Sequence, residues 1–388
     1  MVKRPIYFDH HATTPADPRV VDAMLPFFVD RFGNAASRNH AFGWTASQAV
    51  DAAREQVAAL VGAHHHEITF TSGATESNNL ALQGVATACR ARGNHLVTVA
   101  TEHPSVVEVC RRLEDQGVET TFLPVDADGV VDPAQVARAL TPRTILVTVM
   151  AANNEIGVLQ PVAEIGRLTR ERGILFHTDA SQAVGKVPFD VEEAQVDLAS
   201  FTAHKMYGPK GIGALYVRRR CVDLPPLMQG GGQERGLRPG TLNVPAIVGF
   251  GVAAEIGRRE MPEERVRLGA LRDRLLDGLR AGIGGLRVNG SLERRLPHNL
   301  NVSFEGIESE SLAMAIDDIA VSSGSACGTG KATPSRVLKA LGLDDELAVA
   351  SIRFGLGRWT TEEEVDYVIE KVTRVVEGLR RLRAAMDE

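Results

Sequence analysis

One lysine in this sequence lies where it could react with an aldehyde. Lys205 follows an apolar stretch predicted to be a strand, Leu198–Thr202, and precedes a loop that contains Gly208 and Gly211. A lysine held in such a loop and partly shielded from water can lose its proton and condense with a carbonyl group. Most lysines are surface residues, however, so this segment alone leaves both interpretations open.

An acidic residue ends the preceding predicted strand. Asp179 is the last residue of the apolar stretch Ile174–Asp179. The carboxyl ends of parallel strands border the crevice in which α/β proteins bind ligands. A carboxylate there can keep a pyridine nitrogen protonated, which pyridoxal 5'-phosphate (PLP) needs in order to accept electrons. Asp179 alone could equally be a helix N-cap, but together with Lys205 it favours a cofactor site.

Other predicted strands also end in polar groups. Residues 70–78 pass from a strand through a glycine into a helix start, which suits a phosphate although Ser and Thr also cap helices structurally. The spacings of a Walker loop and of a dinucleotide fingerprint are absent. His103 follows another strand and could stack on a flat ring, although most histidines do not. Asn154 follows the strand Thr144–Met150, so several polar groups converge on one sheet edge.

Cys327 stands among small residues, in the stretch Val321–Gly330. Structural cysteines usually have apolar neighbours, as we expect for Cys89 and Cys110 on helices. We predict that Cys327 lies on an open loop, from which a thiolate can reach a substrate and move away again. Arg353 could bind a substrate carboxylate through two hydrogen bonds, with a surface salt bridge as the alternative.

Two segments resemble metal sites and are interpreted otherwise. His64, His65 and His66 are adjacent, and we expect that three adjacent histidines cannot all face one ion, so a solvated loop is predicted. Asp126 and Asp128 resemble the start of a calcium loop. The glutamate that such a loop needs at position 12 is missing, and we predict a turn.

The predicted fold is α/β, with a mostly parallel central sheet. Apolar strands alternate with helical patterns over the first two thirds of the chain, which is typical of a parallel sheet covered on both faces. The predicted strands are Ile68–Thr71, His95–Ala100, Thr120–Val125, Thr144–Met150, Ile174–Asp179, Leu198–Thr202 and Gly213–Val217. The predicted helices between them include Glu76–Ala91, Ser105–Gln116, Pro133–Leu140 and Pro161–Arg172.

The pattern changes after about Pro245. Two helices are predicted, Ala246–Arg258 and Glu263–Ala281, followed by the strands Asn299–Phe304 and Ala350–Phe354. A last helix is predicted to begin with a capping box of Thr360 and Glu363. We therefore predict a large α/β domain, residues 13–255, and a smaller α+β domain formed by residues 1–12 and 256–388, which carries the Cys327 loop.

Charge and composition exclude several classes of protein. The net charge of −6 over 388 residues predicts no nucleic-acid surface. No apolar stretch approaches the roughly 20 residues of a membrane helix, and the first residues lack the apolar run of a signal peptide. The four cysteines form no C-x-x-C pair, which argues against a disulfide framework and a structural zinc site. A cytoplasmic protein without membrane contact is expected.

These residues together resemble the NifS/IscS-type cysteine desulfurases, which belong to the class V aminotransferase group of fold-type I PLP enzymes. The similarity extends over nearly the whole chain. The motifs that carry it are Asp9–Pro15, Phe32–Asn34, Thr71–Asn79, Asn153–Gly157, the segment around Lys205, Gly240–Thr241 and the Cys327 loop. The first five indicate a class V enzyme, and Ser-Gly-Ser-Ala-Cys327 is much more specific.

The resemblance implies a PLP site. Lys205 would bind the cofactor covalently, and Asp179 and Gln182 would hold its ring nitrogen and its phenolic oxygen. His103 would stack on the ring and transfer protons. The phosphate would be bound by Ala74, Thr75, Thr202, His204 and the partner subunit's Thr241. Thr202 stands where related sequences usually have serine, which preserves the hydroxyl group.

The resemblance also implies a reaction. Asn154 and Arg353 would hold the carboxylate of L-cysteine, and Cys327 would attack its sulfur, leaving alanine and an enzyme persulfide. No intrinsic metal is implied, although Cys327 could transiently ligate a nascent iron–sulfur cluster. Alternatives are a PLP-dependent aminotransferase or a selenocysteine lyase on the same scaffold, or a binding protein without turnover, against which the complete set of reactive residues argues.

The family implies a homodimer and a sulfur-acceptor protein such as an iron–sulfur scaffold. Thiolation of tRNA and cofactor synthesis are further possible destinations for the sulfur. The sequence ends at Glu388, soon after its last predicted helix, whereas housekeeping members have a longer tail that helps to dock the scaffold. The acceptor is therefore left open. His11 stands where related sequences carry other residues, and its role is open too.

Overall fold

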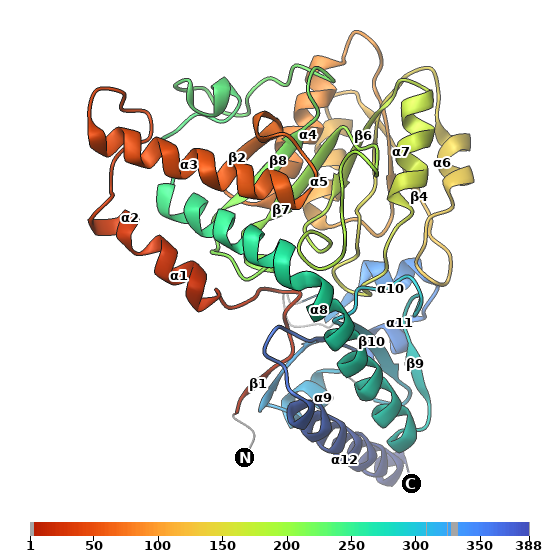
Figure 1. The fold of residues 1–388 in the computed structure, drawn as a ribbon. Coiled ribbons are helices and arrows are strands. Elements are labelled where there is room, and N and C mark those ends of the chain that lie inside the picture. Colours follow the sequence, from red (N-terminus) through yellow and green to blue (C-terminus); the bar gives the residue numbers. More distant parts are fainter. Residues whose placement is uncertain (1–3, 308, 324, 327–332, 388) are drawn as a thin grey trace.

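The computed structural model describes residues 4–307, 309–323, 325–326 and 333–387. Figure 1 shows two bodies, a larger one with α3 to α7 and a smaller one with α9 and α12, which are joined by the long helix α8 (Val244–Gly282). Cys327 lies outside the described residues, so its prediction of an open loop stays a prediction.

A seven-stranded sheet forms the centre of the larger body, with the order β2-β8-β7-β6-β5-β3-β4. The strands are β2 (Ile68–Thr71), β3 (His95–Val99), β4 (Glu119–Leu123), β5 (Thr144–Thr148), β6 (Leu175–Asp179), β7 (Leu198–Thr202) and β8 (Gly213–Val217). All pairs are parallel except the two that involve β8. The predicted mostly parallel α/β sheet is confirmed.

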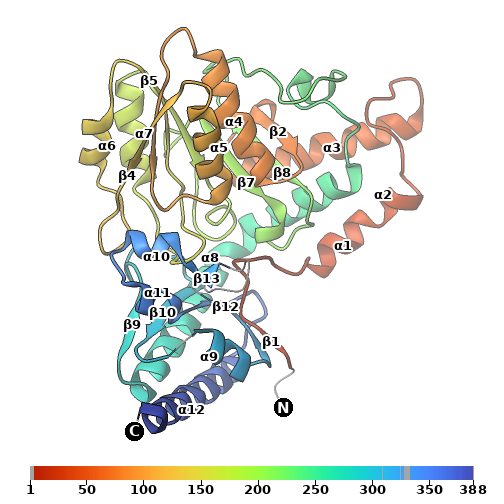
Figure 2. The same cartoon turned by 180° about the vertical axis from the view of Figure 1, so that it is seen from behind.

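Helices cover both faces of this sheet. The helices α4 and α5 lie on one face, and α3 and the first part of α8 on the other (Figures 1 and 2). Every residue of β3, β5, β6 and β7 is consequently buried, which explains their continuous apolar sequences. The helices of this body are α1 (Pro18–Met24), α2 (Pro26–Val29), α3 (Ala41–Leu60), α4 (Ala74–Ala88), α5 (Pro104–Glu114), α6 (Pro133–Ala139) and α7 (Val162–Glu171), with 3-10 turns η1 (His65–Glu67), η2 (Ala203–Lys205) and η3 (Gln233–Gly236).

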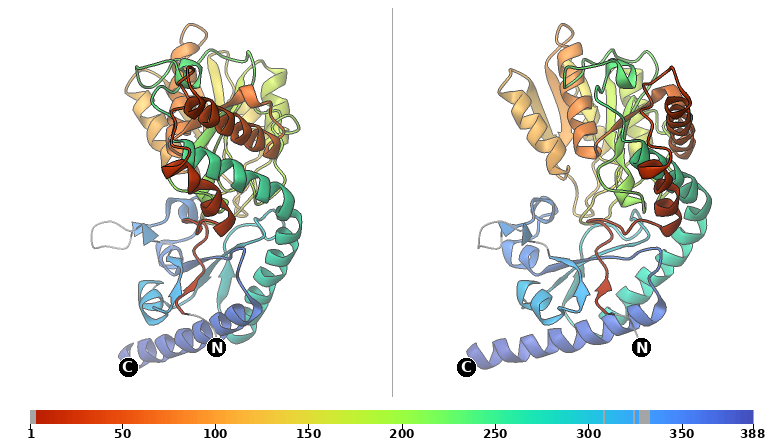
Figure 3. Two further views of the ribbon diagram at one scale, coloured as in Figure 1. Left: turned by 60° about the vertical axis from the view of Figure 1, so that its left-hand side comes forward. Right: turned by 90° about the vertical axis from the view of Figure 1, so that its left-hand side faces the viewer.

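The smaller body has an antiparallel sheet of order β12-β15-β10-β9. Its strands are β9 (Leu286–Val288), β10 (Asn299–Phe304), β12 (Ser322–Ser323) and β15 (Ser351–Gly355); β1 (Ile6–Tyr7) pairs with β11 (Ile319–Ala320), and β13 (Ser325–Ala326) with β14 (Thr333–Pro334). Its helices are α9 (Ser309–Ala315), α10 (Arg336–Ala340), α11 (Asp345–Val349) and α12 (Glu362–Asp387). Ile6 and Phe8 from the N-terminal segment pack into its core. Figure 3 shows α12 along the side of this body that faces away from the larger body.

Two local predictions are wrong. The predicted helices on either side of Pro262 form one 39-residue helix, α8. Proline removes one helical hydrogen bond, but Phe250 packs into the core of the larger body and Leu275 into that of the smaller one, which holds both halves of the helix in place. The capping box of α12 is formed by Thr361 and Glu364, one residue later than predicted.

The division into two domains stays a prediction. The predicted boundary near residue 255 falls inside α8, so the chain passes from one body to the other in the middle of a helix. The apolar cores of the two bodies are separate clusters of side chains. Among the described helices, none has the length and apolar character that spanning a bilayer requires.

Candidate active site

A cavity of about 560 Å³ lies where the carboxyl ends of several parallel strands meet. It brings together most of the residues predicted for the site, from segments that are far apart in the sequence. The predicted residues that line it are Ala74, Thr75, His103, Asn154, Asp179, Gln182, Thr202, His204 and Lys205. The expected convergence of polar groups on one sheet edge is therefore observed.

Lys205 lies in the 3-10 turn η2, directly after β7. Its Nζ atom donates hydrogen bonds to the backbone carbonyl groups of His11 and Ala12, the latter at 2.7 Å. Burial, together with the positive charge of Arg353, lowers the pKa of Lys205 to about 8, although Asp179 opposes the shift. A substantial fraction of this amine is consequently neutral, and thus nucleophilic, near neutral pH.

Asp179 ends β6, and both of its carboxylate oxygens have partners. Oδ2 accepts a hydrogen bond of 2.8 Å from Nδ2 of Asn78, and Oδ1 accepts one of 3.0 Å from the backbone N–H of Ser181. The residue is 6% exposed. Since a carboxylate oxygen can accept more than one hydrogen bond, the group is held in one orientation and can still accept a bond from a ring nitrogen.

His103 is the N-cap residue of α5, and this fixes its tautomer. Its Nδ1 atom accepts a hydrogen bond of 3.1 Å from the backbone N–H of Ser105 and lies 2.8 Å from Oγ of the same residue. Burial lowers the pKa of His103, which favours the neutral ring. Because Nδ1 is an acceptor, the proton of the neutral ring is on Nε2.

The N-terminus of α4 forms the end of the cavity that is predicted to bind phosphate. Its N-cap residue, Gly73, makes no side-chain capping bond, so the first N–H groups of the helix are free to bind an anion. A Cβ atom built on Gly73 would have no neighbour within 4 Å, which shows open space there. Across the cavity, Oγ1 of Thr202 donates to the carbonyl group of Ile212 at 3.0 Å.

Arg353 does not line the cavity but touches a residue that does. On β15, its guanidinium group donates to the carbonyl oxygen of Asn154 at 2.8 Å, to Oδ1 of Asp9 at 2.6 Å and to Oγ of Ser322 at 2.7 Å. Its Nε atom is buried and has no partner among the described residues. The arginine is therefore held beside Asn154, with its Nε donor still available.

Thr241 is not brought into the cavity. It is exposed, in the loop that leads into α8. Arg238 of the same loop forms a salt bridge of 2.9 Å with Glu76 in the first turn of α4. Within one chain, Thr241 thus lies outside the predicted phosphate site, and its role stays a prediction.

Three residues for which the sequence predicts no role contact the predicted site residues: Asn78, Ser105 and His11. Nδ2 of Asn78 donates to Asp179 and, at 2.8 Å, to Oγ of Ser105, which lies against His103. The sequence does contain one indication for Asn78. It follows Ala74 by four residues in a helix, so it lies on the same face of the helix as a predicted site residue. No comparable local signal exists for His11, because its contacts come from distant parts of the chain.

The two metal-like segments differ in outcome. The ligand atoms of His64, His65 and His66 lie within 4.8 Å of one another, so the expectation that these histidines cannot face one ion is wrong. The chain forms a 3-10 turn there, which brings successive side chains together. The pKa of His66 is lowered, first by the charge of His65, then by burial and by His64, and least by Arg235 and Arg219; positive charge gathered there opposes a bound cation. The predicted turn at Asp126 is confirmed, since Oδ1 of Asp126 accepts the N–H of Val130 at 2.8 Å.

The mostly parallel sheet, the half-buried lysine with its lowered pKa and the strand-end cavity define a cofactor-dependent enzyme of the α/β class. The chain belongs to the aminotransferase class-V family, whose model matches residues 6–368. A relative named cysteine desulfurase IscS, from Anaeromyxobacter sp. (strain Fw109-5), is 60% identical over 382 residues, which cover 98% of this chain and 95% of that protein. The family resemblance predicted from the sequence is confirmed.

Solved structures agree with this assignment. A structure described as a NifS-like protein has a TM-score of 0.91 and 40% identity, and the match covers 97% of this chain and 100% of that one. Another, described as SspA in complex with cysteine, has a TM-score of 0.81 and 37% identity, with coverage of 92% and 100%.

Enzymes of this family use PLP, and PLP is the cofactor of this chain. The residues present fit this group. A lysine with a lowered pKa, a fixed carboxylate at Asp179 and an uncapped helix N-terminus at Gly73 border one cavity. These are the donors and acceptors that an aldehyde, a pyridine nitrogen and a phosphate each require.

Proposed function

We propose that this chain is a cysteine desulfurase that converts L-cysteine to L-alanine and retains the sulfur as a persulfide on Cys327. The names of its relatives support the activity, and a structural neighbour is described as a complex with cysteine. The observation that carries the proposal is a juxtaposition. One cavity is bordered by the Lys205 amine, the Asp179 carboxylate and the His103 ring. The described segments before and after Cys327 form hydrogen bonds with residues next to this cavity.

The cofactor end of the cavity provides the proton chemistry. Bound PLP supplies an electron-withdrawing ring that weakens bonds at the substrate α- and β-carbons. Asp179, oriented by Asn78 and Ser181, would hold the proton of the ring nitrogen. The amine of Lys205 would hold the cofactor by its aldehyde group and would carry the α-proton of the substrate. His103, which lines the same cavity with its proton on Nε2, would contact the ring.

The substrate end provides recognition of the carboxylate. The guanidinium group of Arg353 binds the substrate carboxylate, with Nε as a donor that has no other partner among the described residues. The side-chain amide of Asn154, which lines the cavity, adds a further contact. Asp9 holds Arg353 in place before the substrate binds, so its carboxylate must share this arginine with the substrate.

The segments that flank Cys327 support its access to the cavity. On one side, Oγ of Ser322 donates to Oδ1 of Asp9 at 2.8 Å. On the other side, Ser335 donates to the carboxylate of Glu155, and Arg336 to the carbonyl group of Glu102, the neighbours of Asn154 and His103. Short strands connect these anchors to Cys327, since Ala326 pairs with Thr333. We infer that the thiol reaches the sulfur of a bound substrate.

The proposed transfer is balanced without an external oxidant. The Cys327 thiolate forms a bond to the substrate sulfur, the bond between this sulfur and the β-carbon breaks, and the β-carbon takes up a proton. The products are alanine and a persulfide, which contain all atoms of cysteine and the enzyme thiol. An acceptor thiol, for example on an iron–sulfur scaffold protein, then removes the outer sulfur.

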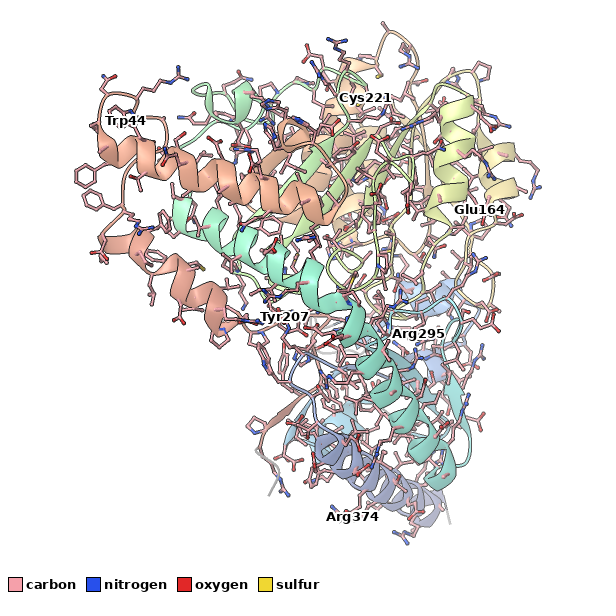
Figure 4. All side chains as sticks on the ribbon, viewed as in Figure 1. Trp44, Glu164, Tyr207, Cys221, Arg295 and Arg374 are labelled. Atoms are coloured by element: carbon pink, nitrogen blue, oxygen red, sulfur yellow. The ribbon has the colours of Figure 1, made fainter. Side chains whose placement is uncertain are left out.

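We also propose a cytoplasmic homodimer. Large apolar side chains are exposed around α1, α2 and the start of α3, which is the composition of a buried interface. They include Leu25, Phe28, Val29, Phe32, Phe42 and Trp44; Figure 4 labels Trp44, which projects from the larger body. In such a dimer the partner subunit's Thr241 would complete the phosphate site. The free thiols of Cys89, Cys110 and Cys221 suit a reducing compartment.

Replacement of Cys327 tests the proposal directly. The Cys327→Ala holoenzyme should retain its visible cofactor band but form alanine from L-cysteine at least about a thousandfold more slowly, and mass spectrometry should find no added sulfur atom. Cys221→Ala is the matched control and should behave as the parent. Full turnover by Cys327→Ala would contradict the persulfide role. Transfer of the amino group to a keto acid would favour the aminotransferase alternative, and a strong preference for selenocysteine would favour the lyase.

A further inference from the structure

His11 has no predicted role, yet two residues predicted to bind the cofactor form hydrogen bonds with it. Its backbone carbonyl group accepts hydrogen bonds from Nζ of Lys205 and, at 3.0 Å, from Nε2 of Gln182. Its Nδ1 atom lies 3.1 Å from Oε1 of Gln182, and its Nε2 atom lies 3.0 Å from Nδ2 of Asn299. The residue is 1% exposed. His11 and Gln182 thus make two reciprocal contacts, and the far side of the ring contacts the smaller body.

Arg295 determines how the amide group of Asn299 is oriented. Its guanidinium group donates to Oδ1 of Asn299 at 3.0 Å and also to backbone carbonyl groups of residues 289–291. A guanidinium group can only donate, so the atom that it contacts on Asn299 is the oxygen. Nδ2 of Asn299 also donates to the carbonyl group of Glu155 at 3.1 Å, which agrees with this orientation. Figure 4 labels Arg295 near the level at which the two bodies meet.

This orientation determines the tautomer of His11. Since Nδ2 of Asn299 is a donor, Nε2 of His11 must accept, and the proton of the neutral ring is on Nδ1. Burial, together with the positive charge of Arg353, keeps the pKa of His11 well below its usual value, so the ring is neutral. Nδ1–H therefore donates to Oε1 of Gln182.

These groups are closely packed. A Cβ atom on Gly157, which has a φ of +71°, would lie 2.4 Å from Cγ of Asn299. A Cβ atom on Gly355 would lie 2.8 Å from Cδ2 of His11. The ring of His298 stacks on the ring of His11 with centroids 4.4 Å apart. The glycines allow this close approach, and the hydrogen bonds decide which way the amide group and the ring face.

We propose that His11 is a positioning residue: it turns the amide of Gln182 so that an N–H group, not an oxygen, faces the phenolic oxygen of PLP. Oε1 of Gln182 is taken by His11, and one hydrogen of Nε2 is taken by the His11 carbonyl group, so the second hydrogen is left for the cavity that Gln182 lines. The chain Arg295–Asn299–His11–Gln182 thereby transmits an orientation from the smaller body to the cofactor. The proposal rests on the cofactor part of the proposed function, but not on cysteine as the substrate.

Two substitutions of His11 separate the hydrogen bond from packing. His11→Leu fills a similar volume and removes the donor, whereas His11→Asn places an amide nitrogen near the position of Nδ1 and can still donate to Gln182. For His11→Leu we expect the apoenzyme to bind PLP about tenfold more weakly, and the pH midpoint of the visible band to rise by about one unit, because a hydrogen bond to a charged oxygen is lost. For His11→Asn we expect both values to lie near those of the parent.

His298→Phe is the matched control. This histidine is as deeply buried as His11 and its ring stacks on the ring of His11, but its two ring nitrogens have no hydrogen-bond partner among the described residues. Its replacement should leave PLP affinity and the band midpoint within about twofold and a few tenths of a pH unit of the parent. Thermal unfolding of each apoprotein shows whether the variants are folded before PLP is added.

The outcomes are decisive in both directions. Parent-like affinity and midpoint in His11→Leu, or an equal loss in His11→Asn, would overturn the proposal, because the hydrogen bond would then be irrelevant. Should His11→Leu not fold, nitrogen-15 NMR of the parent holoenzyme, with the His11 signals assigned from the folded Asn variant, decides: a proton on Nδ1 supports the proposal, and one on Nε2 refutes it. These measurements need PLP but no cysteine, so they are independent of a failure of the desulfurase activity.

Discussion

The two bodies contribute to the site in different ways: residues of the larger body line the cavity, and the smaller body places Arg353 beside Asn154, which lines it. In the larger body, Asp179 and His103 are held by Asn78 and Ser105, which belong to that same body. In the smaller body, Arg353 is held by partners from several segments, including Asp9 and the carbonyl group of Asn154 in the larger body. The cofactor end is therefore organised within one unit, whereas the substrate end depends on how two units meet.

This contrast has a kinetic meaning. Changes at the cofactor end should alter PLP binding and the rate of the chemical step, because its groups act on the reacting atoms. Changes at the substrate end should mainly alter the affinity for cysteine.

Loss of the amine at the cofactor end should have the largest effect. Lys205→Ala should abolish the visible band of covalently bound PLP and lower kcat for alanine formation by at least about a thousandfold, because both the attachment point and the proton carrier are removed. Absorption spectra and alanine assays measure this. Lys339→Ala, at an exposed lysine on α10, is the control. A Lys205→Ala variant with normal turnover would refute the assignment of the cofactor end.

Arg353→Leu should act on the substrate end. We expect KM for L-cysteine to rise about 100-fold, equivalent to about 3 kcal/mol, with a much smaller change in kcat, because a charge-assisted bidentate contact is lost. Arg353→Lys should recover part of this loss, since it restores the charge but not the planar fork. Steady-state kinetics of alanine formation distinguish the two parameters. An equal fall in kcat with an unchanged KM would mean that Arg353 acts at the cofactor end.

The lowered pKa of Lys205 predicts a pH profile that connects the two ends. The neutral amine reacts with PLP, so the rate of PLP attachment to the apoenzyme should rise about tenfold per unit at pH values below 8 and become constant above it. Stopped-flow absorption measures this rate without cysteine. The charge of Arg353 lowers this pKa, so the midpoint should move to higher pH in Arg353→Leu. A rate that increases up to pH 10 in the parent would indicate an ordinary lysine.

Thr202 should give the smallest effect. Its Oγ1 atom donates to the carbonyl group of Ile212, and serine can make the same bond. Thr202→Ser should therefore change PLP affinity by less than about twofold, whereas Thr202→Val should weaken it about fivefold, as for the loss of one neutral hydrogen bond. Equilibrium titration of the apoprotein with PLP compares the two variants. Equal losses in both would show that the methyl group, not the hydroxyl, is needed.

The strand ends of the cofactor site could be predicted because each is a local pattern. An apolar run followed by Asp179 or by Lys205 shows in sequence where a strand ends, and parallel pairing brings such ends together. The family motifs supplied the rest of the predicted residues, and the cavity contains most of them. The seven strands of the large sheet were likewise predicted within about two residues at each end, since apolar and β-branched residues predominate in most of them.

The errors have physical causes that are not local. Pro262 predicts a helix break, but packing of α8 against two cores outweighs one lost hydrogen bond. The histidines at 64–66 come together because a 3-10 turn forms there. The contacts of His11 with Gln182 and Asn299 join positions 171 and 288 residues apart, and no periodicity within a sequence window can reveal them.

The continuity of α8 limits how far the two bodies can move relative to each other. A helix of 39 residues is about 58 Å long and resists bending far more than an interdomain loop would. Movement of one body relative to the other must bend this helix, in which Pro262 removes one hydrogen bond, so only small-angle movements are expected. Substrate entry and sulfur delivery would then depend on local loop motion and not on wide separation of the two halves.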